Sequence, residues 1–216
     1  MAVKTYTYSD TTQLTPHFKA GEFRCKCGKS HDTLISDELL QKLETLRDTL
    51  DCSKIIVNSG YRCASHDKSV GGTGSGQHTK GTAADVVCYG QDGQPISSKM
   101  VCCTAQDLGF GGIANITSAY TSTHLDVRTG SRWYGDEVYG TNTVTSDFYS
   151  YFGIAKASGA TARNPSVKAK GIDVSKHQGV IDWDKVKASG KVDFAMTGSA
   201  LAAISPVRTM HKRCGI

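Results

Sequence analysis

The sequence predicts an α+β domain, because amphipathic helices and short strands follow one another without regular βαβ repetition. The clearest helix is expected at residues 36–50, where leucines recur at helical spacing along one face. Ser36 is a suitable N-cap, and Asp37 and Glu38 suit the positive end of the helix dipole. A second helix is expected at residues 97–109, closed by a C-terminal glycine.

Three short segments are predicted as strands. KIIVN at residues 54–58 is largely apolar and runs into a glycine turn, and TAADVVCY at 82–89 is another apolar run. STHLDVR at 122–128 alternates polar and apolar residues, as a half-buried strand does. With 38% hydrophobic residues, the chain has enough apolar side chains to bury a core.

The composition changes near residue 155, where AKASGATARNPSVKAK has the small, basic, glycine- and proline-containing texture of a linker. We therefore predict a folded domain at residues 1–153, a basic flexible linker at 154–170 and a separate piece at 171–216. Residues 1–150 carry 14 Lys+Arg against 16 Asp+Glu, whereas residues 151–216 carry 11 against 4. This basic tail suits a polyanion such as nucleic acid, teichoic acid or a membrane surface, or it is a solvated linker before an incomplete domain.

Neither a membrane span nor a secretory signal is recognisable. The chain has no apolar run of about 18 residues, and the opening MAVKTYTYSD lacks the apolar segment of a signal peptide. We expect a protein that is made in the cytoplasm, does not insert into membranes, and reaches an extracellular substrate by another export route. Its eight cysteines are then expected to be mostly free thiols.

Two pairs of imidazole and carboxylate groups suggest a metal site. His78 and Asp85 lie seven residues apart in QHTKGTAAD, and the segment before His78 is rich in glycine, which allows tight turns. His124 and Asp126 lie two apart on a predicted strand, so both point to the same face. Zinc accepts imidazole nitrogen and carboxylate oxygen, with three protein ligands in a catalytic site. Each signal alone also fits ordinary surface or core residues, and the spacing by itself leaves the choice open.

Three sequence elements carry a family resemblance. SGYRC at 59–63, SVGGTGSGQHTKGTAADVV at 69–87 and THLDVR at 123–128 resemble, in this order, the zinc D-alanyl-D-alanine peptidases. That superfamily includes phage endolysin peptidases and the hedgehog fold. The resemblance extends to LTPHFKAGEFRCKCG and the leucine-rich helix, and so covers residues 12–135. It implies a hedgehog-like domain with a small antiparallel sheet and flanking helices.

The resemblance also implies roles for site residues. His78, Asp85 and His124 would bind Zn²⁺. Arg62 would meet the negative charge of a substrate carboxylate or oxyanion, for which its planar fork of donors is suited. Asp126 would be the general base that activates the attacking water, or it would orient a metal ligand.

One position departs from several relatives. They carry HxH, or an acidic residue three positions before the last histidine, where this chain has HxD and Thr121. The assignment of the base therefore stays open, including an exchange of roles between His124 and Asp126. Imidazole favours His124 as the ligand.

The implied substrate is a peptide bond in the stem or cross-link of bacterial peptidoglycan, cut by a monomeric, endolysin-like enzyme of a phage or prophage. The alternative is a zinc-containing cell-wall binding module without turnover. A nucleic-acid binder is not expected, because aromatic and basic residues are not interleaved.

The tail carries a second resemblance. GIDVSKHQGVIDWDKVKASGKVDFAM at 171–196 resembles the opening strand, helix and second strand of the family-25 lysozymes, with Asp173 at the end of the first strand. The paired carboxylates that a glycosidase needs would lie beyond residue 216. After Met196 the sequence departs from that family. We therefore expect an incomplete β/α-barrel fragment without muramidase activity.

Two further groups of residues each allow two interpretations. Cys25, Cys27 and His31 in FRCKCGKSH, with Cys63 folded nearby, would give a structural zinc site, or they are buried or incidental thiols. The aromatic pair at residues 133–134 would line a cleft mouth or pack in the core.

Overall fold

The computed structural model describes residues 2–139, 144 and 147–156, together with the backbone of 171–174, 194–197 and 200–203. The chain forms two compact units, Met1–Arg163 and Asn164–Ile216. Most of the predicted linker lies outside the described residues, so its limits stay a prediction. In the described part of the chain, no helix is long and apolar enough to cross a lipid bilayer.

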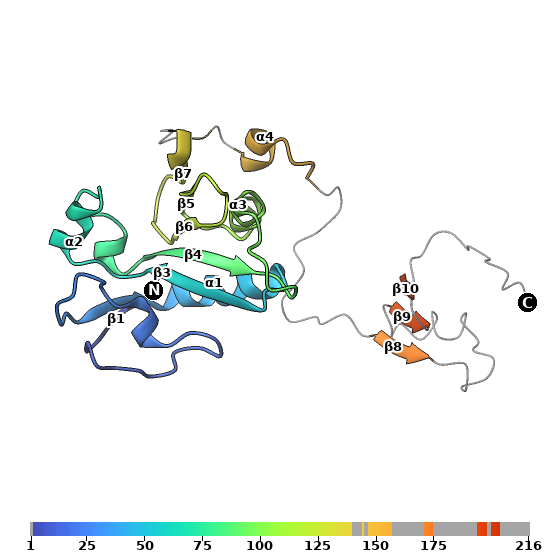
Figure 1. Ribbon diagram of the computed structural model, residues 1–216, viewed down its shortest axis with the longest axis horizontal. Coiled ribbons are helices and arrows are strands. Elements are labelled where there is room, and N and C mark those ends of the chain that lie inside the picture. The colour runs from blue at the N-terminus through green and yellow to red at the C-terminus, as the bar shows by residue number, and fades with distance from the viewer. Residues whose placement is uncertain are drawn as a thin grey trace, which may run out of the picture. The chain divides into compact units, whose positions relative to one another are not determined.

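A five-stranded sheet forms the framework of the first unit (Figure 1). Its strand order is β3-β4-β6-β5-β7, and every pair is antiparallel except the parallel pair β5–β7. The strands are β3 (Lys54–Ser59), β4 (Ala83–Tyr89), β5 (Gly112–Asn115), β6 (Thr123–Asp126) and β7 (Trp133–Asp136). The predicted α+β class with a small antiparallel sheet is confirmed, with β5 and β7 as additional strands.

Helices and a small second sheet complete this unit. The predicted helices are α1 (Asp37–Thr49) and α3 (Ser98–Asp107), and Ser36 caps α1 by accepting the backbone N–H of Leu39. A separate two-stranded sheet pairs β1 with β2. The other elements are β1 (Val3–Tyr6), β2 (Thr33–Ser36), α2 (Ala64–Ser69), α4 (Phe148–Phe152) and the 3₁₀ turns η1 (Ala20–Phe23), η2 (His78–Lys80) and η3 (Glu137–Tyr139).

The core lies where α1 and α3 pack on the sheet. Helix α1 contacts β4, and α3 contacts β5 and β6. The apolar face of α1 is fully buried, which removes side chains worth about 1.5–3 kcal/mol each from water. The largest buried aliphatic side chains at this junction are Leu39, Leu43, Leu46, Val101, Ile113 and Leu125. This packing fixes β4 and β6, the neighbouring strands that carry two of the predicted ligands, Asp85 and His124.

Gly81 joins the turn η2 to strand β4. Its φ of +71° is a left-handed conformation, and a Cβ there would lie 2.4 Å from the carbonyl oxygen of Leu34. Its own carbonyl accepts the backbone N–H of Ser36 at 2.9 Å. A glycine is therefore required for η2 to pass so close to the start of α1.

The second unit contains three described strands, β8 (Gly171–Val174), β9 (Phe194–Thr197) and β10 (Ala200–Ala203). β8 pairs with β9 in parallel, and β10 pairs with β9 antiparallel. The helix predicted between β8 and β9 lies outside the described residues.

Candidate metal centre

Strand pairing brings two of the predicted ligands face to face. β4 and β6 are antiparallel neighbours, and their register places Asp85 directly opposite His124. His78 comes from η2, immediately before β4, and its ring reaches the same point. The three side chains therefore converge although they lie up to 46 residues apart in the sequence.

The three ligand atoms form a nearly equilateral triangle. His78 Nε2 lies 3.1 Å from His124 Nδ1, His124 Nδ1 lies 3.0 Å from Asp85 Oδ1, and Asp85 Oδ1 lies 3.2 Å from His78 Nε2. Ligand atoms about 2.0–2.1 Å from a tetrahedral zinc ion are separated by about 3.3 Å. The spacing of the donors thus fits zinc.

Hydrogen bonds on the far side of each ring fix which nitrogen faces the triangle. His78 Nδ1 lies 2.7 Å from the carbonyl oxygen of Gly60, which only accepts, so Nδ1 carries the proton. His124 Nε2 lies 3.2 Å from Asp126 Oδ2 and donates to it. Both rings therefore present a lone pair to the point that Asp85 faces, which is the arrangement of imidazole ligands and their outer partners at metal sites.

Asp126 is completely buried, and both of its oxygens are engaged. Arg128 donates to Oδ1 from its backbone N–H at 2.9 Å and from Nε at 3.0 Å. It donates to Oδ2 from Nε at 2.9 Å and also from Nη2. Gly112 leaves the space for this carboxylate, since a Cβ there would lie 2.0 Å from Oδ2. Asp126 is thus placed to hold His124 in one orientation.

Arg62 lies beside the triangle on the side of Asp85. Its Nη2 donates to Asp85 Oδ2, the oxygen turned away from the histidines, and its Nε donates to Ser59 Oγ at 2.7 Å. Its Nη1 lies 3.6 Å from Asp67 Oδ1. Asp67 is buried and also accepts the backbone N–H of Gly74 at 2.8 Å. The guanidinium is therefore held from two sides, with N–H groups left for a ligand.

The pKa values follow from this crowding of charges. Burial disfavours protonation of His124, but hydrogen bonds to Asp126 and Asp85 outweigh it and raise its pKa to about 9. Burial alone would raise the pKa of Asp85, whereas the two histidines hold it well below its usual range. The pKa of Asp126 falls to about 2 for the same reason, since His124 and Arg128 outweigh burial. Positive charge at the centre is therefore strongly favoured: a second proton on His124 in the absence of metal, or a metal ion that takes the place of that proton.

Trp133 and Tyr134, for which a cleft mouth and the core were the two predicted locations, lie in different surroundings. Trp133 stands edge-on to His124, with ring centroids 5.9 Å apart, and the Arg128 guanidinium lies 5.0 Å from its ring centre. Tyr134 is buried and packs on Phe148. Trp133 therefore borders the metal centre, and Tyr134 belongs to the core.

Sequence reasoning did not single out Asp67 or Arg128. The contact between Arg62 and Asp67 spans five residues and depends on how the chain turns into α2, so it matches neither helical nor strand spacing. Arg128 is the last residue of THLDVR. Its position two residues after Asp126 on the predicted strand could have indicated that the two side chains lie on the same face.

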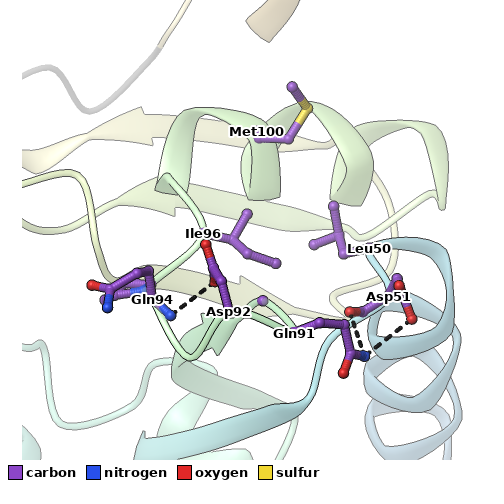
Figure 2. A pocket seen from close by; sticks show the side chains of 9 residues that line it. Leu50, Asp51, Gln91, Asp92, Gln94, Ile96 and Met100 are labelled. Atoms are coloured by element: carbon purple, nitrogen blue, oxygen red, sulfur yellow. Dashed lines mark hydrogen bonds between the residues drawn. The ribbon is translucent and has the colours of Figure 1, made fainter. Parts of the chain in front are cut away.

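A shallow hollow at the other end of β4 is separate from this centre (Figure 2). It lies between the end of α1, the turn after β4 and the start of α3, and it contains Leu50, Ile96 and Met100. Gln91 and Asp51 also line this hollow, and Gln91 Nε2 donates to Asp51 Oδ1 at 3.2 Å. Asp85 lies near the start of β4 and the hollow lies beyond its end, so none of the predicted ligands lines it.

Comparison with known proteins adds the family. No curated protein matches the chain. The family model described as Peptidase M15 matches residues 16–129, which is just over half of the chain and includes Arg62, the three converging ligands and Asp126. Since this match spans the whole metal centre, the chain belongs to the peptidase M15 family, whose members are metallopeptidases that usually carry zinc.

Proposed function

We propose that this protein is a zinc metallopeptidase that hydrolyses a peptide bond in the stem or cross-link of bacterial peptidoglycan. The observation that carries the proposal is the convergence of three lone pairs from His78, Asp85 and His124 at tetrahedral spacing. Family membership supports the peptidase activity. The resemblance of the SGYR, HxxGxAxD and HxD elements to D-alanyl-D-alanine peptidases supports peptidoglycan as the substrate.

His78, Asp85 and His124 would hold the zinc ion. Zinc in this position supplies Lewis-acid chemistry, because it lowers the pKa of water and polarises a carbonyl group. The protein's contribution is to hold three donors ready: the Gly60 carbonyl fixes the His78 ring, and Asp126 fixes the His124 ring. Such preorganisation avoids rearrangement of the site when substrate arrives.

Arg62 would bind the negative charge of the substrate, as a terminal carboxylate or as the oxyanion of the reaction. Its attachment to Asp85 and Ser59 aims the guanidinium at the metal centre. An arginine held in this way offers two parallel N–H donors to a carboxylate. It would therefore place the scissile bond next to the three ligands.

Asp126 would act mainly by orienting His124. Both of its oxygens already accept hydrogen bonds, and no part of it is exposed to solvent. A general base needs an oxygen within reach of the proton that it takes. The geometry thus favours orientation over the base role, and an exchange of ligand roles between His124 and Asp126 is less favoured, because Arg128 already holds the carboxylate.

The same proposal covers the origin and partner of the protein. The sequence fits an endolysin-like enzyme of a phage or prophage that is made in the cytoplasm and acts as a monomer on peptidoglycan. The lysozyme-like fragment is supported by the parallel pairing of β8 and β9, which is how a β/α barrel begins. Two modules directed at one polymer would strengthen the choice of peptidoglycan.

The test incubates the full chain, with and without zinc, with purified peptidoglycan and measures newly freed amino groups and fragment masses. Zinc-dependent release identifies the bond. His78→Ala is expected to abolish it, and His66→Ala is the matched control, because the half-buried His66 lies on α2 and its ring nitrogen Nδ1 contacts Ser69 Oγ of the same helix at 3.5 Å. Release that survives His78→Ala would contradict the proposal.

A second function is favoured by one observation. Both carboxylates at the centre accept hydrogen bonds from arginines: the predicted ligand Asp85 from Arg62, and Asp126 from Arg128. This suits a wall-binding module that holds zinc without turnover. Such a protein would bind one zinc ion at this centre and sediment with peptidoglycan, yet release no amino groups.

A further inference from the structure

A second group of potential metal ligands lies outside the centre described above. The sulfur atoms of Cys25, Cys27 and Cys63 lie within 4.8 Å of one another. Cys25 and Cys27 belong to the loop after η1, and Cys63 precedes α2, so the group joins two distant parts of the chain. None of the three is in a disulfide.

Backbone contacts hold the two loops together. The backbone N–H of Tyr61 donates to the carbonyl oxygen of Phe23 at 2.8 Å, and that of Cys63 donates to Cys25 Sγ at 3.3 Å. Gly60 allows this approach, because a Cβ there would lie 2.7 Å from the Cα of Phe23. These backbone contacts fix the proximity of Cys25 and Cys63, and Cys27 follows Cys25 by two residues in the same loop.

Three adjacent thiols suit a metal better than they suit a disulfide. One disulfide would leave the third sulfur unpaired beside it. Thiolates bind zinc at about 2.3 Å, which places sulfurs about 3.8 Å apart in a tetrahedral site, and this spacing is compatible with the group. Free thiols are also the expected state of a chain made in a reducing compartment.

His31 is the candidate for a fourth ligand. It follows Cys27 by four residues in the same loop, and its Nε2 is buried without a hydrogen-bond partner. Buried polar atoms are nearly always bonded, so an unbonded imidazole nitrogen points to a missing partner. His31 lies outside the three-sulfur group as the structure places it, so the loop would have to move for His31 to become the fourth ligand.

We propose that Cys25, Cys27 and Cys63 bind a second zinc ion, a structural one that is separate from the His78, Asp85 and His124 centre. This ion fastens the loop after η1 to residues 59–63. That segment carries Arg62 and also the Gly60 carbonyl that fixes the His78 ring. The second zinc would therefore hold in place the loop that shapes the first centre.

The test reconstitutes the full 216-residue chain with Co²⁺ under reducing conditions. Thiolate ligands give Co²⁺ an intense sulfur-to-metal charge-transfer band in the near ultraviolet, which imidazole and carboxylate ligands do not give. The wild-type chain is expected to bind two ions and to show this band. Cys63→Ser is expected to bind one ion and lose the band, whereas His78→Ala is expected to bind one ion and keep it.

Cys214→Ser is the matched thiol control, since it removes the cysteine that lies outside the described residues, and it should keep two ions and the band. His31→Ala should weaken the thiolate site, and an unchanged affinity would remove His31 from the ligand set. One ion per chain without a charge-transfer band would overturn the proposal. A disulfide joining two of the three cysteines in the purified protein would overturn it equally.

A further measurement covers the case in which Cys63→Ser does not fold. Zinc is expected to slow the alkylation of Cys25, Cys27 and Cys63 to the same extent in the wild-type chain and in His78→Ala, as followed by peptide mass. Alkylation that is insensitive to zinc would overturn the proposal. These readouts report thiolate ligation alone, so they are independent of peptidase activity.

Discussion

Asp126 has no exposed surface, and the same arginine contacts both of its oxygens while His124 contacts one of them. At the scale of single residues, three side chains of the candidate metal centre thus contact one another in succession. The predicted ligand His124 is oriented by Asp126, and Asp126 is fixed by Arg128. Outer partners of this kind typically change metal affinity by about 10–100-fold when they are removed. Removal of Asp126 or Arg128 should therefore weaken metal binding although neither is among the three predicted ligands.

Asp126→Asn tests which role this residue has. The amide keeps the shape but removes the charge that fixes the His124 ring, so zinc affinity is expected to fall by about 10–100-fold in a chelator competition titration. Asp107→Asn, which changes a more exposed carboxylate, is the control and should leave the affinity unchanged. Full zinc affinity together with lost peptidase activity would instead identify Asp126 as the general base.

Arg62→Lys separates charge from geometry. Lysine keeps the positive charge but cannot donate from a planar fork to Asp85 and to a substrate carboxylate together. Hydrogen bonds to charged groups are worth about 1.5–3 kcal/mol, so kcat/KM is expected to fall by about 10–100-fold. Arg47→Lys, at a surface arginine bonded to the Ser53 carbonyl, should have no effect on the kinetics. Wild-type kcat/KM in Arg62→Lys would show that charge alone suffices.

At the scale of elements, the sequence predicts what depends on local pattern. The leucine spacing and the Ser36 cap predict α1 to within a residue at either end, because helix signals lie close together in the chain. Strands β5 and β7 were not predicted. Each has four residues, and their parallel pairing depends on neighbours that only the folded sheet supplies.

The candidate site likewise has residues that the sequence predicted and residues that it did not. The sequence resemblance brought His78, Asp85 and His124 together as ligands, and the register of β4 with β6 shows how they meet. Asp67 was not predicted, because its contact with Arg62 spans five residues and depends on how the chain turns into α2. A polar contact at that spacing matches neither the helical nor the strand period, so it leaves no periodic signal in a sequence.

Gly81→Ala tests the junction between η2 and β4. Alanine at φ +71° is strained, and its Cβ would strike the Leu34 carbonyl, so we expect a loss of about 1–3 kcal/mol in the free energy of unfolding. Gly130→Ala is the matched control, because its φ is +90° but no atom lies within 4 Å of the added Cβ. Urea unfolding of both variants should show the larger loss for Gly81→Ala. Equal losses would mean that the close approach to Leu34 is unimportant.

At the scale of the whole molecule, acid should weaken the fold through contacts between distant segments. Glu44 on α1 accepts the backbone N–H of His17 at 2.9 Å and contacts its ring nitrogen at 2.7 Å. Burial would raise the pKa of Glu44, but hydrogen bonds from Thr15 and His17 outweigh it and lower that pKa. The folded chain therefore binds fewer protons here than the unfolded chain does. This stabilisation is complete above the ordinary pKa of 4.5 and is lost as the pH falls through the lowered value.

Glu44→Gln is accordingly expected to reduce the drop in urea midpoint between about pH 5 and pH 3, measured without metal. Asp48→Asn, on an exposed position of the same helix, should follow the wild-type curve. If the urea midpoint of Glu44→Gln falls with pH as steeply as that of the wild-type chain, the prediction is wrong.

Zinc removal should also destabilise the first unit. A ligand that binds only the folded state stabilises it by about 2.7 kcal/mol at 100 times its dissociation constant. The thermal midpoint of the chelator-treated chain is therefore expected to rise on adding zinc, and the rise should be smaller in His78→Ala. An unchanged midpoint in the wild-type chain would show that the folded state does not bind zinc preferentially.

The register of β4 with β6 has a mechanical consequence. Asp85 and His124 are cross-strand partners, so an ion held between them and His78 would tie β6 to the η2–β4 segment, which lies 39 to 46 residues away in the sequence. The bound ion would act as a reversible cross-link across the middle of the sheet, closing a loop of the kind that a disulfide closes in secreted proteins. Unlike a disulfide, this cross-link would survive a reducing environment and would open when the ion is withdrawn. The supply of zinc would then determine how firmly the sheet is held as well as whether the enzyme works.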